Sequence, residues 1–153
     1  MKIRTSLLSI VGCLVLASVC FAQEALMGTW KLNESKSKLG GGTKNTTVVY
    51  EPAGDSVKVT IDGTDSAGKP THNEWTGKFD GKDYPVTGDP NSDMRSYTKA
   101  GDHTLHFKVS KGGKTTTSGS ITTSADGKTR TVNATGTDPA GKKFKTDAVY
   151  DKQ

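Results

Sequence analysis

The fold is decided by residues 56–79, which read SVKVTIDGTDSAGKPTHNEWTGKF. The first nine of these residues alternate strictly, with Val57, Val59 and Ile61 on one face and polar or small side chains between them. Alternation with a period of two is typical of a β-strand that buries one face. The tetrapeptide Asp65-Ser66-Ala67-Gly68 then supplies a tight turn, and alternation resumes after it. The stretch therefore predicts two antiparallel strands joined as a hairpin.

Similar turn signals recur along the chain, and no segment between them carries a helical apolar stripe. Each contains a glycine that can adopt the positive φ a tight hairpin needs. Strand-length segments separated by such turns predict an antiparallel up-and-down meander. The seven turn signals lie at residues 52–55, 65–68, 80–81, 100–102, 112–113, 126–127 and 138–141.

Nine or ten strands are expected, and residues 35–45, which contain three consecutive glycines, are expected to form a loop. A row of this many antiparallel strands tends to curl and close, because closure removes its exposed edges. The expected fold is therefore all-β, a meander closing into a barrel of about 8–10 strands, with a two-sheet β-sandwich as the alternative. The expected strands are residues 27–33, 46–53, 56–64, 71–79, 83–88, 94–100, 103–111, 114–123, 129–137 and 142–151.

The first 22 residues have the order of a secretory signal peptide: basic residues, an apolar run and small residues before Gln23. Cleavage after Ala22 would leave residues 23–153 as a single domain. Lipidation at Cys13 is the alternative, because residues 10–13 resemble a lipobox. Both cysteines, Cys13 and Cys20, lie in this segment, so the exported chain would have none. Export without disulfides is typical of the bacterial periplasm, and we expect a secreted or periplasmic protein.

Charge and motifs exclude several classes of function. After signal removal, nineteen basic residues face sixteen acidic ones, and the lysines are spread over the turns, which argues against nucleic acid as a partner. We expect a monomer without a stable membrane span. His72 and Glu74 share a strand face, but two ligands without a third make no metal site. The chain has no serine nucleophile elbow and no phosphate-binding loop, so we expect neither an enzyme nor a cofactor.

The segment Leu26-Met27-Gly28-Thr29-Trp30-Lys31-Leu32 resembles the opening of the calycins. These include the lipocalins, with Gly-x-Trp, and the intracellular fatty-acid-binding proteins, with Gly-Thr-Trp-Lys-Leu. Residues 148–152 are similar to the last strand of the fatty-acid-binding family. The resemblance implies a barrel in which Gly28 bends the first strand and Trp30 plugs the closed end. Where that family has an arginine that holds a carboxylate, two residues before the tyrosine of the last strand, this chain has Ala148.

A second resemblance covers more of the chain. Residues 28–33 and 80–86 look like segments of small secreted bacterial proteins of unknown function. This likeness supports export and implies no particular activity.

Two arginines, Arg95 and Arg130, stand against seventeen lysines in the chain after residue 22. A rare arginine among lysines suggests a role that needs the planar guanidinium group, such as pairing with a carboxylate or stacking on an aromatic ring. Arg130 shares a face with the apolar residues of its strand, and Arg95 shares a face with Tyr97. The alternatives are a structural arginine that covers Trp30 or a plain surface residue.

The apolar inventory is thin for so many strands, so the interior is expected to be polar or partly empty, which favours a cavity. The sequence therefore predicts a lipocalin-like binding protein for a small, amphipathic, anionic ligand. The alternative is a non-enzymatic module for protein interaction or for a structural role in the envelope. The candidate ligand-binding residues are Arg130, Arg95, Tyr97, Trp75, Phe107 and Tyr150.

Overall fold

The computed structural model describes residues 21–153. The expected signal peptide, with Cys13 and Cys20, lies outside the described residues except for its last two positions. These two residues begin a short helix, α1 (Phe21–Leu26), that precedes the first strand.

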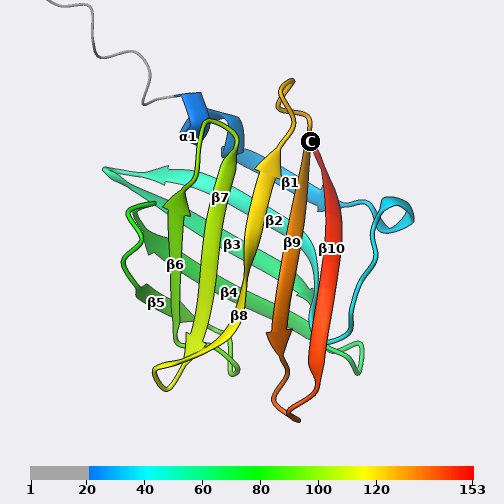
Figure 1. The fold of residues 1–153 in the computed structure, drawn as a ribbon. Coiled ribbons are helices and arrows are strands. Elements are labelled where there is room, and N and C mark those ends of the chain that lie inside the picture. Colours follow the sequence, from blue (N-terminus) through cyan, green and yellow to red (C-terminus); the bar gives the residue numbers. More distant parts are fainter. Residues whose placement is uncertain (1–20) are drawn as a thin grey trace, which may run out of the picture.

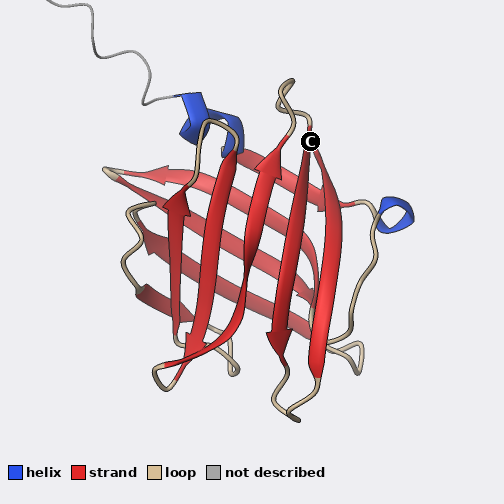
Figure 2. Cartoon of the chain, in the orientation of Figure 1, coloured by secondary structure: helices blue, strands red, loops and turns tan. Residues whose placement is uncertain are grey.

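Ten antiparallel strands follow α1 and close into one barrel (Figures 1 and 2). Each strand pairs with the next one in sequence, and the first also pairs with the last. The predicted all-β meander is therefore confirmed, as a barrel and not as a sandwich. A 3₁₀ turn, η1 (Glu34–Lys36), lies in the expected loop. The strands are β1 (Gly28–Leu32), β2 (Lys44–Ala53), β3 (Ser56–Thr64), β4 (Pro70–Gly77), β5 (Tyr84–Thr87), β6 (Met94–Lys99), β7 (Thr104–Lys111), β8 (Lys114–Thr123), β9 (Thr129–Thr137) and β10 (Lys143–Lys152).

All seven expected turns contain a glycine with positive φ. Two of them share the sequence Asp-x-Ala-Gly-Lys and the same hydrogen bonds. Asp65 Oδ1 accepts from the backbone N–H groups of Ala67 and Lys69, each at 2.9 Å. Asp138 Oδ1 accepts in the same way from the N–H groups two and four residues later, at 3.0 and 2.8 Å. The aspartate side chain thus satisfies backbone donors that the turn leaves free.

Some strand ends differ from the prediction for local reasons. β4 ends at Gly77 and not at Phe79. At Gly77 the rings of Trp75 and Tyr84 lie so close to the backbone that a Cβ atom would be 2.6 Å from both. β2 begins two residues earlier than expected, at Lys44, and its register with β3 shifts between Asn45 and Thr47. Neither crowding nor a bulge is visible in the alternation of the sequence.

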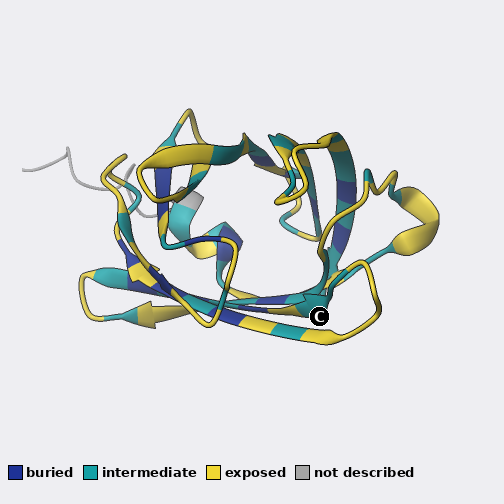
Figure 3. Ribbon diagram, turned by 90° about the horizontal axis from the view of Figure 1, so that it is seen from below, coloured by how far each residue is buried: buried dark blue, intermediate teal, exposed yellow. Residues whose placement is uncertain are grey.

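The barrel has two halves, and the strands of β1–β5 cross behind those of β6–β10 (Figure 1). Exposed residues lie in the turns and on the outer face, as the view from below shows (Figure 3). Trp30 is fully buried, as the sequence predicted, and its indole Nε1 donates to the carbonyl oxygen of Leu26 at 2.8 Å. Leu26 ends α1, so the helix and the tryptophan together close this end of the barrel.

Burial along the inner face of β7–β10 falls from one end of the barrel to the other. Near α1 the inward residues, such as Leu105 and Ile121, are buried. Toward the β7–β8 and β9–β10 turns the inward residues, such as Val109, Ala134 and Phe144, are only partly buried. The interior is therefore better reached from the end opposite α1.

Candidate functional site

The structure places all six candidate residues on the inner face of the barrel. Five are buried, and Phe107 is partly buried against the core. They fall into two groups, one at the closed end around Arg130 and one in the middle of the interior around Trp75. The buried five are Arg95, Arg130, Tyr97, Trp75 and Tyr150.

Arg130 lies at the closed end, enclosed by three aromatic rings. It is the direct cross-strand partner of Tyr150, and its guanidinium carbon lies 4.6 Å from the centre of that ring. The same carbon lies 5.1 Å from the ring centre of Tyr50 and 5.2 Å from that of Trp30. These distances are within the range of cation–π attraction. Arg130 therefore covers Trp30, which is the structural arrangement that the sequence left open as an alternative.

Hydrogen bonding of Arg130 is nevertheless incomplete. Its Nε and Nη1 atoms are buried and have no hydrogen-bond partner in the structure. Aromatic faces offset part of the cost of burying the charge, but they do not replace acceptors for N–H groups.

Trp75 is the centre of the second group. The centre of its ring system lies 4.8 Å from that of Tyr97 and 5.8 Å from that of Tyr84, both edge to face, and Phe79 stacks on it at 6.3 Å. Tyr97 in turn contacts Phe107 at 6.3 Å between ring centres. The sequence predicts Phe79 on the same strand face as Trp75, as a residue able to line a cavity, although it is not among the candidate ligand-binding residues. Sequence reasoning missed Tyr84 as a member of the group.

Arg95 lies beside this group and is 5% exposed. Its Nη2 atom donates to Asn73 Oδ1 at 3.1 Å, whereas Nη1 is buried without a partner. The carbonyl oxygen of Arg95 accepts from the indole Nε1 of Trp75 at 2.9 Å. Asn73, which is 7% exposed, was not among the candidate residues, although its spacing puts it on the same face as Trp75.

Tyr97 lies within the influence of both arginines. Burial raises its pKa to about 12, and the guanidinium charges of Arg95 and Arg130 act in the opposite direction. Burial likewise raises the pKa of Tyr150 to about 12, against the charge of Arg130. Both phenols therefore stay neutral at physiological pH.

The interior carries two buried positive charges, and one carboxylate oxygen, Oδ1 of Asp93, two residues before Arg95, is also buried without a hydrogen-bond partner. Among residues 21–153, the buried polar and charged side chains are Asn73, Ser92, Ser96, Thr123 and the two arginines, with no carboxylate among them. An isolated buried cation is costly unless an anion or several acceptors meet it. The arrangement can therefore attract a small anion to the interior.

Other classes of site find little support in the described part of the chain. His72 Nδ1 lies 2.7 Å from Asp62 Oδ1, and His72 Nε2 lies 3.9 Å from Glu74 Oε1. No set of three such side chains within residues 21–153 is placed to hold a metal ion. No helix in this part of the chain is long and apolar enough to cross a membrane.

Designed proteins resemble this structure. A redesigned β-barrel has a TM-score of 0.50 and 16% sequence identity, covering 90% of this chain and 99% of that chain. A barrel bound to DFHBI, EF1p2_mFAP2b, has a TM-score of 0.49 at 16% identity, covering 87% of this chain and 98% of that one. The redesigned barrel mFAP1, also bound to DFHBI, has a TM-score of 0.46 at 20% identity, with coverage of 86% and 99%.

No protein-family model matches the chain, and no curated protein matches it. The likeness to the first designed barrel concerns the fold alone, a closed antiparallel β-barrel.

Proposed function

We propose that this protein is an exported, lipocalin-like carrier that binds a small anionic, amphipathic molecule inside its barrel. One observation carries the proposal. Two arginines are buried in the interior, and three of their N–H-bearing nitrogens have no partner. Among residues 21–153 the one carboxylate with a buried, unpartnered oxygen is that of Asp93, which is only partly buried, so positive charge is in excess.

The two arginines have different parts in this proposal. The charge of Arg130 is offset by three aromatic rings, so this residue has a structural share in closing the barrel. Arg95 has one acceptor, Asn73, and a free Nη1. It is also the cross-strand partner of Val109, which lies toward the more accessible end of the interior. The anionic group of the ligand would therefore meet Arg95 first.

The apolar part of the ligand would lie against the rings of Trp75, Tyr97 and Phe107. Burial of that part would supply most of the affinity, because a hydrogen bond to a charged group adds only about 1.5–3 kcal/mol. The free nitrogens of Arg130 would add a second attraction for negative charge deeper in the barrel. The resemblance to the calycins at Gly28 and Trp30 agrees with a carrier of this kind.

Titration with an anionic, environment-sensitive fluorophore tests the proposal. Protein freed of lipid should bind 1-anilinonaphthalene-8-sulfonate with saturation. The substitutions Arg95→Met and Arg130→Ala should each weaken binding by about tenfold to a hundredfold, the equivalent of about 1.4–2.8 kcal/mol.

Lys128→Ala is the matched control, because it removes an exposed positive charge two residues from Arg130. Its affinity should equal that of the unmodified protein. A lack of saturable binding across a panel of anionic fluorophores would overturn the carrier proposal and leave the interaction module as the better explanation. Unchanged affinity in both arginine variants would do the same.

Export is a separate part of the proposal, supported by the order of residues 1–22. Intact-mass measurement of the protein recovered outside the cytoplasm should find a chain that begins at Gln23. A lipid-modified chain that begins at Cys13 would contradict cleavage after Ala22.

A further inference from the structure

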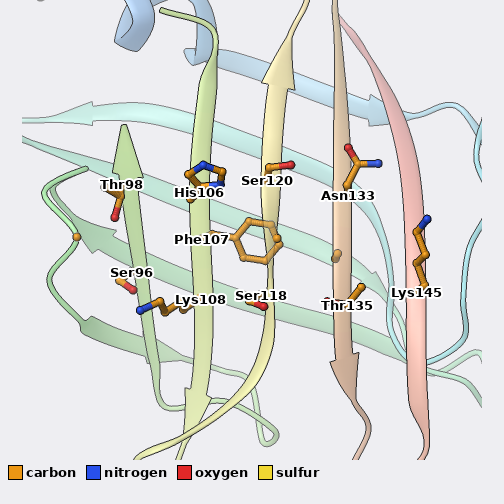
Figure 4. A pocket seen from close by; sticks show the side chains of 13 residues that line it. Ser96, Thr98, His106, Phe107, Lys108, Ser118, Ser120, Asn133, Thr135 and Lys145 are labelled. Atoms are coloured by element: carbon orange, nitrogen blue, oxygen red, sulfur yellow. The ribbon is translucent and has the colours of Figure 1, made fainter. Parts of the chain in front are cut away.

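A hollow of about 480 Å³ lies on the outer face of the barrel, across β6–β10 (Figure 4). Its side chains come from positions that alternate with core residues such as Leu105 and Phe107. His106 and Lys108, for example, are exposed and lie on the opposite face from those two residues. Phe107, Gly119 and Ala134, which lie at inward positions of the same strands, also line the hollow, so it opens on the outside and these strands divide it from the candidate site within.

The lining of the hollow forms two rows that run across the strands. Cross-strand pairing joins the members of each row, so neighbouring side chains lie about 4.5–5.5 Å apart. The upper row is Thr98, His106, Ser120 and Asn133, and the lower row is Ser96, Lys108, Ser118, Thr135 and Lys145 (Figure 4). The lower row spans five strands, which at about 4.8 Å per strand is about 19 Å. The upper row spans four strands, and the residue next to it in register, on β10, is Asp147.

The chemistry of these rows is uniform. Most members carry a hydroxyl or an amide, which can both donate and accept hydrogen bonds. The lining includes Lys108, Lys145 and His106 but no carboxylate. Lys145 Nζ lies 3.6 Å from Asp147 Oδ2, an exposed pair that water screens, and the other oxygen of Asp147 accepts from Asn133 at 2.7 Å.

The same chemistry continues beyond this hollow. A second hollow of about 410 Å³ shares Ser118 and Thr135 with the first and extends toward the β9–β10 turn. Its lining adds further threonines and Lys143 and again contains no carboxylate. The two together make a long, polar, weakly basic groove on one half of the barrel.

We propose that this groove binds an acidic oligosaccharide, a sugar chain that carries carboxylate or sulfate groups. Sugar hydroxyls both donate and accept, as do the hydroxyl and amide side chains of the rows. Acidic groups would pair with Lys108 and Lys145, which lie on the second and fifth strands of the groove, β7 and β10, and are separated by β8 and β9. The length of the groove suits an extended chain of several sugar units.

Other polymers fit the groove less well. A peptide commonly adds to a sheet through an unpaired strand edge, and a closed barrel has no such edge. A single-stranded nucleic acid needs aromatic platforms for its bases. Apart from the imidazole of His106, the rings in the lining are those of Phe107 and Phe144, which lie at inward positions of their strands.

The test is a titration of the protein with four probes, followed by amide chemical shifts. The acidic probes are tetragalacturonate and a heparin-derived tetrasaccharide, which distinguish carboxylate from sulfate. Cellotetraose is the neutral probe, and a tetraglutamate peptide is the acidic non-sugar. At least one acidic sugar should bind with saturation and change the amide chemical shifts of residues on the outer face of β6–β10. It should bind at least tenfold more tightly than cellotetraose and the tetraglutamate peptide.

The double variant Lys108→Ala/Lys145→Ala should weaken this binding by at least tenfold, and Thr135→Asp, which puts a carboxylate into the groove, should also weaken it. Lys69→Ala, which removes an exposed lysine from the β3–β4 turn, should leave it unchanged. Arg95→Met should also leave it unchanged, because Arg95 faces the interior. All of these variants except Arg95→Met change exposed side chains. The amide spectrum of each variant shows whether the fold is kept, so a loss of binding can be distinguished from a loss of structure.

Several results would overturn the proposal. These are no saturation with either acidic sugar at millimolar concentration, equal binding of the neutral sugar, tighter binding of the peptide, or unchanged affinity in both groove variants. Shifts confined to inward residues, or a loss of sugar binding in Arg95→Met, would place the sugar in the interior and equally overturn it. Fluorophore binding inside the barrel is measured separately, so failure of the groove proposal and failure of the carrier proposal can be told apart.

Discussion

Trp30 holds the closed end of the barrel through both packing and one hydrogen bond. It is fully buried, its Nε1 is bonded to Leu26, and the guanidinium of Arg130 lies over its ring. Trp30→Ala should lower the free energy of unfolding by about 3–5 kcal/mol, as truncation of large core side chains does. Urea unfolding monitored by circular dichroism measures the loss. A loss below about 1 kcal/mol would mean that the ring contributes little to this end of the barrel.

Replacing Arg95, unlike Trp30, is expected to leave the free energy of unfolding unchanged or to raise it. In the unliganded protein its charge is buried with one hydrogen-bond acceptor, Asn73. Replacing an uncompensated buried charge by an apolar side chain of similar length is often neutral or stabilising. Arg95→Met should therefore unfold at the same or a higher urea concentration than the unmodified protein, while binding the anionic fluorophore less tightly. Marked destabilisation together with unchanged binding would assign Arg95 a purely structural role.

The inward direction of Arg95, Arg130 and Tyr97 could be predicted because strand side chains alternate with a period of two. The residues that surround these side chains could not be predicted from the sequence. Arg130 meets Trp30 and Tyr50 only because β9, β1 and β2 come together when the barrel closes, and these strands are distant in sequence. Alternation assigns a face to each residue, but it does not say which residues face one another across the interior.

At the scale of the elements, two strands of the front half rely on glycines that are covered by aromatic rings. Gly119 of β8 is the cross-strand partner of Phe107, and Gly136 of β9 is the cross-strand partner of Phe144. At each glycine, a Cβ atom would lie within 3 Å of the ring and would also crowd the backbone of the neighbouring strand. Glycine thus lets the ring lie against the backbone where the sheet bends.

Gly119→Ala should for this reason destabilise the protein by about 3 kcal/mol, at the upper end of the cost of overpacking. Gly127→Ala is the comparison, because Gly127 has open space around it and a φ of 70°. It should cost only about 1 kcal/mol, the cost of placing a side chain in the left-handed region. Urea unfolding of both variants gives the ranking. Equal losses would show that the crowding at Gly119 is relieved at little cost.

Element boundaries were predictable where turn and alternation agree. The bounds of β3, β8 and β9 match those expected from the sequence, including the threonine-rich pair that has few apolar residues. The turns limit these strands, and an aspartate or glycine marks each turn. The ends of β2 and β4 were missed because a bulge and the packing of rings set them, and neither follows from local sequence.

For the whole molecule, the sequence could indicate the number of strands but could not decide between a barrel and a sandwich. Closure depends on the pairing of β1 with β10, in which Trp30 lies opposite Lys152. The backbone N–H of Gln153 also donates to the carbonyl oxygen of Thr29 at 3.0 Å. Contacts between the two ends of the domain depend on the twist and bend accumulated over all ten strands, which no single segment encodes.

Closure also buries phenols, and this gives the whole molecule a pH dependence on the alkaline side. Burial raises the pKa values of Tyr97 and Tyr150 to about 12, from an ordinary value of 10.0. Folding therefore favours the neutral phenols. Their contribution to stability is complete below pH of about 10 and is lost as the pH rises toward about 12, because the unfolded chain releases these protons first.

The protein should accordingly unfold in one transition between about pH 10 and pH 12, with tyrosinate absorbance rising as the β-sheet signal falls. The exposed ion pairs of Lys58 and Lys78, whose pKa values are raised by Glu74 and Asp55, also weaken in this range. Added salt screens those exposed pairs but not the buried phenols, so the transition should persist at 1 M salt. Tyr97→Phe should move its midpoint upward. Complete ionisation of all tyrosines near pH 10 in a protein that keeps its sheet signal would contradict the burial of these phenols.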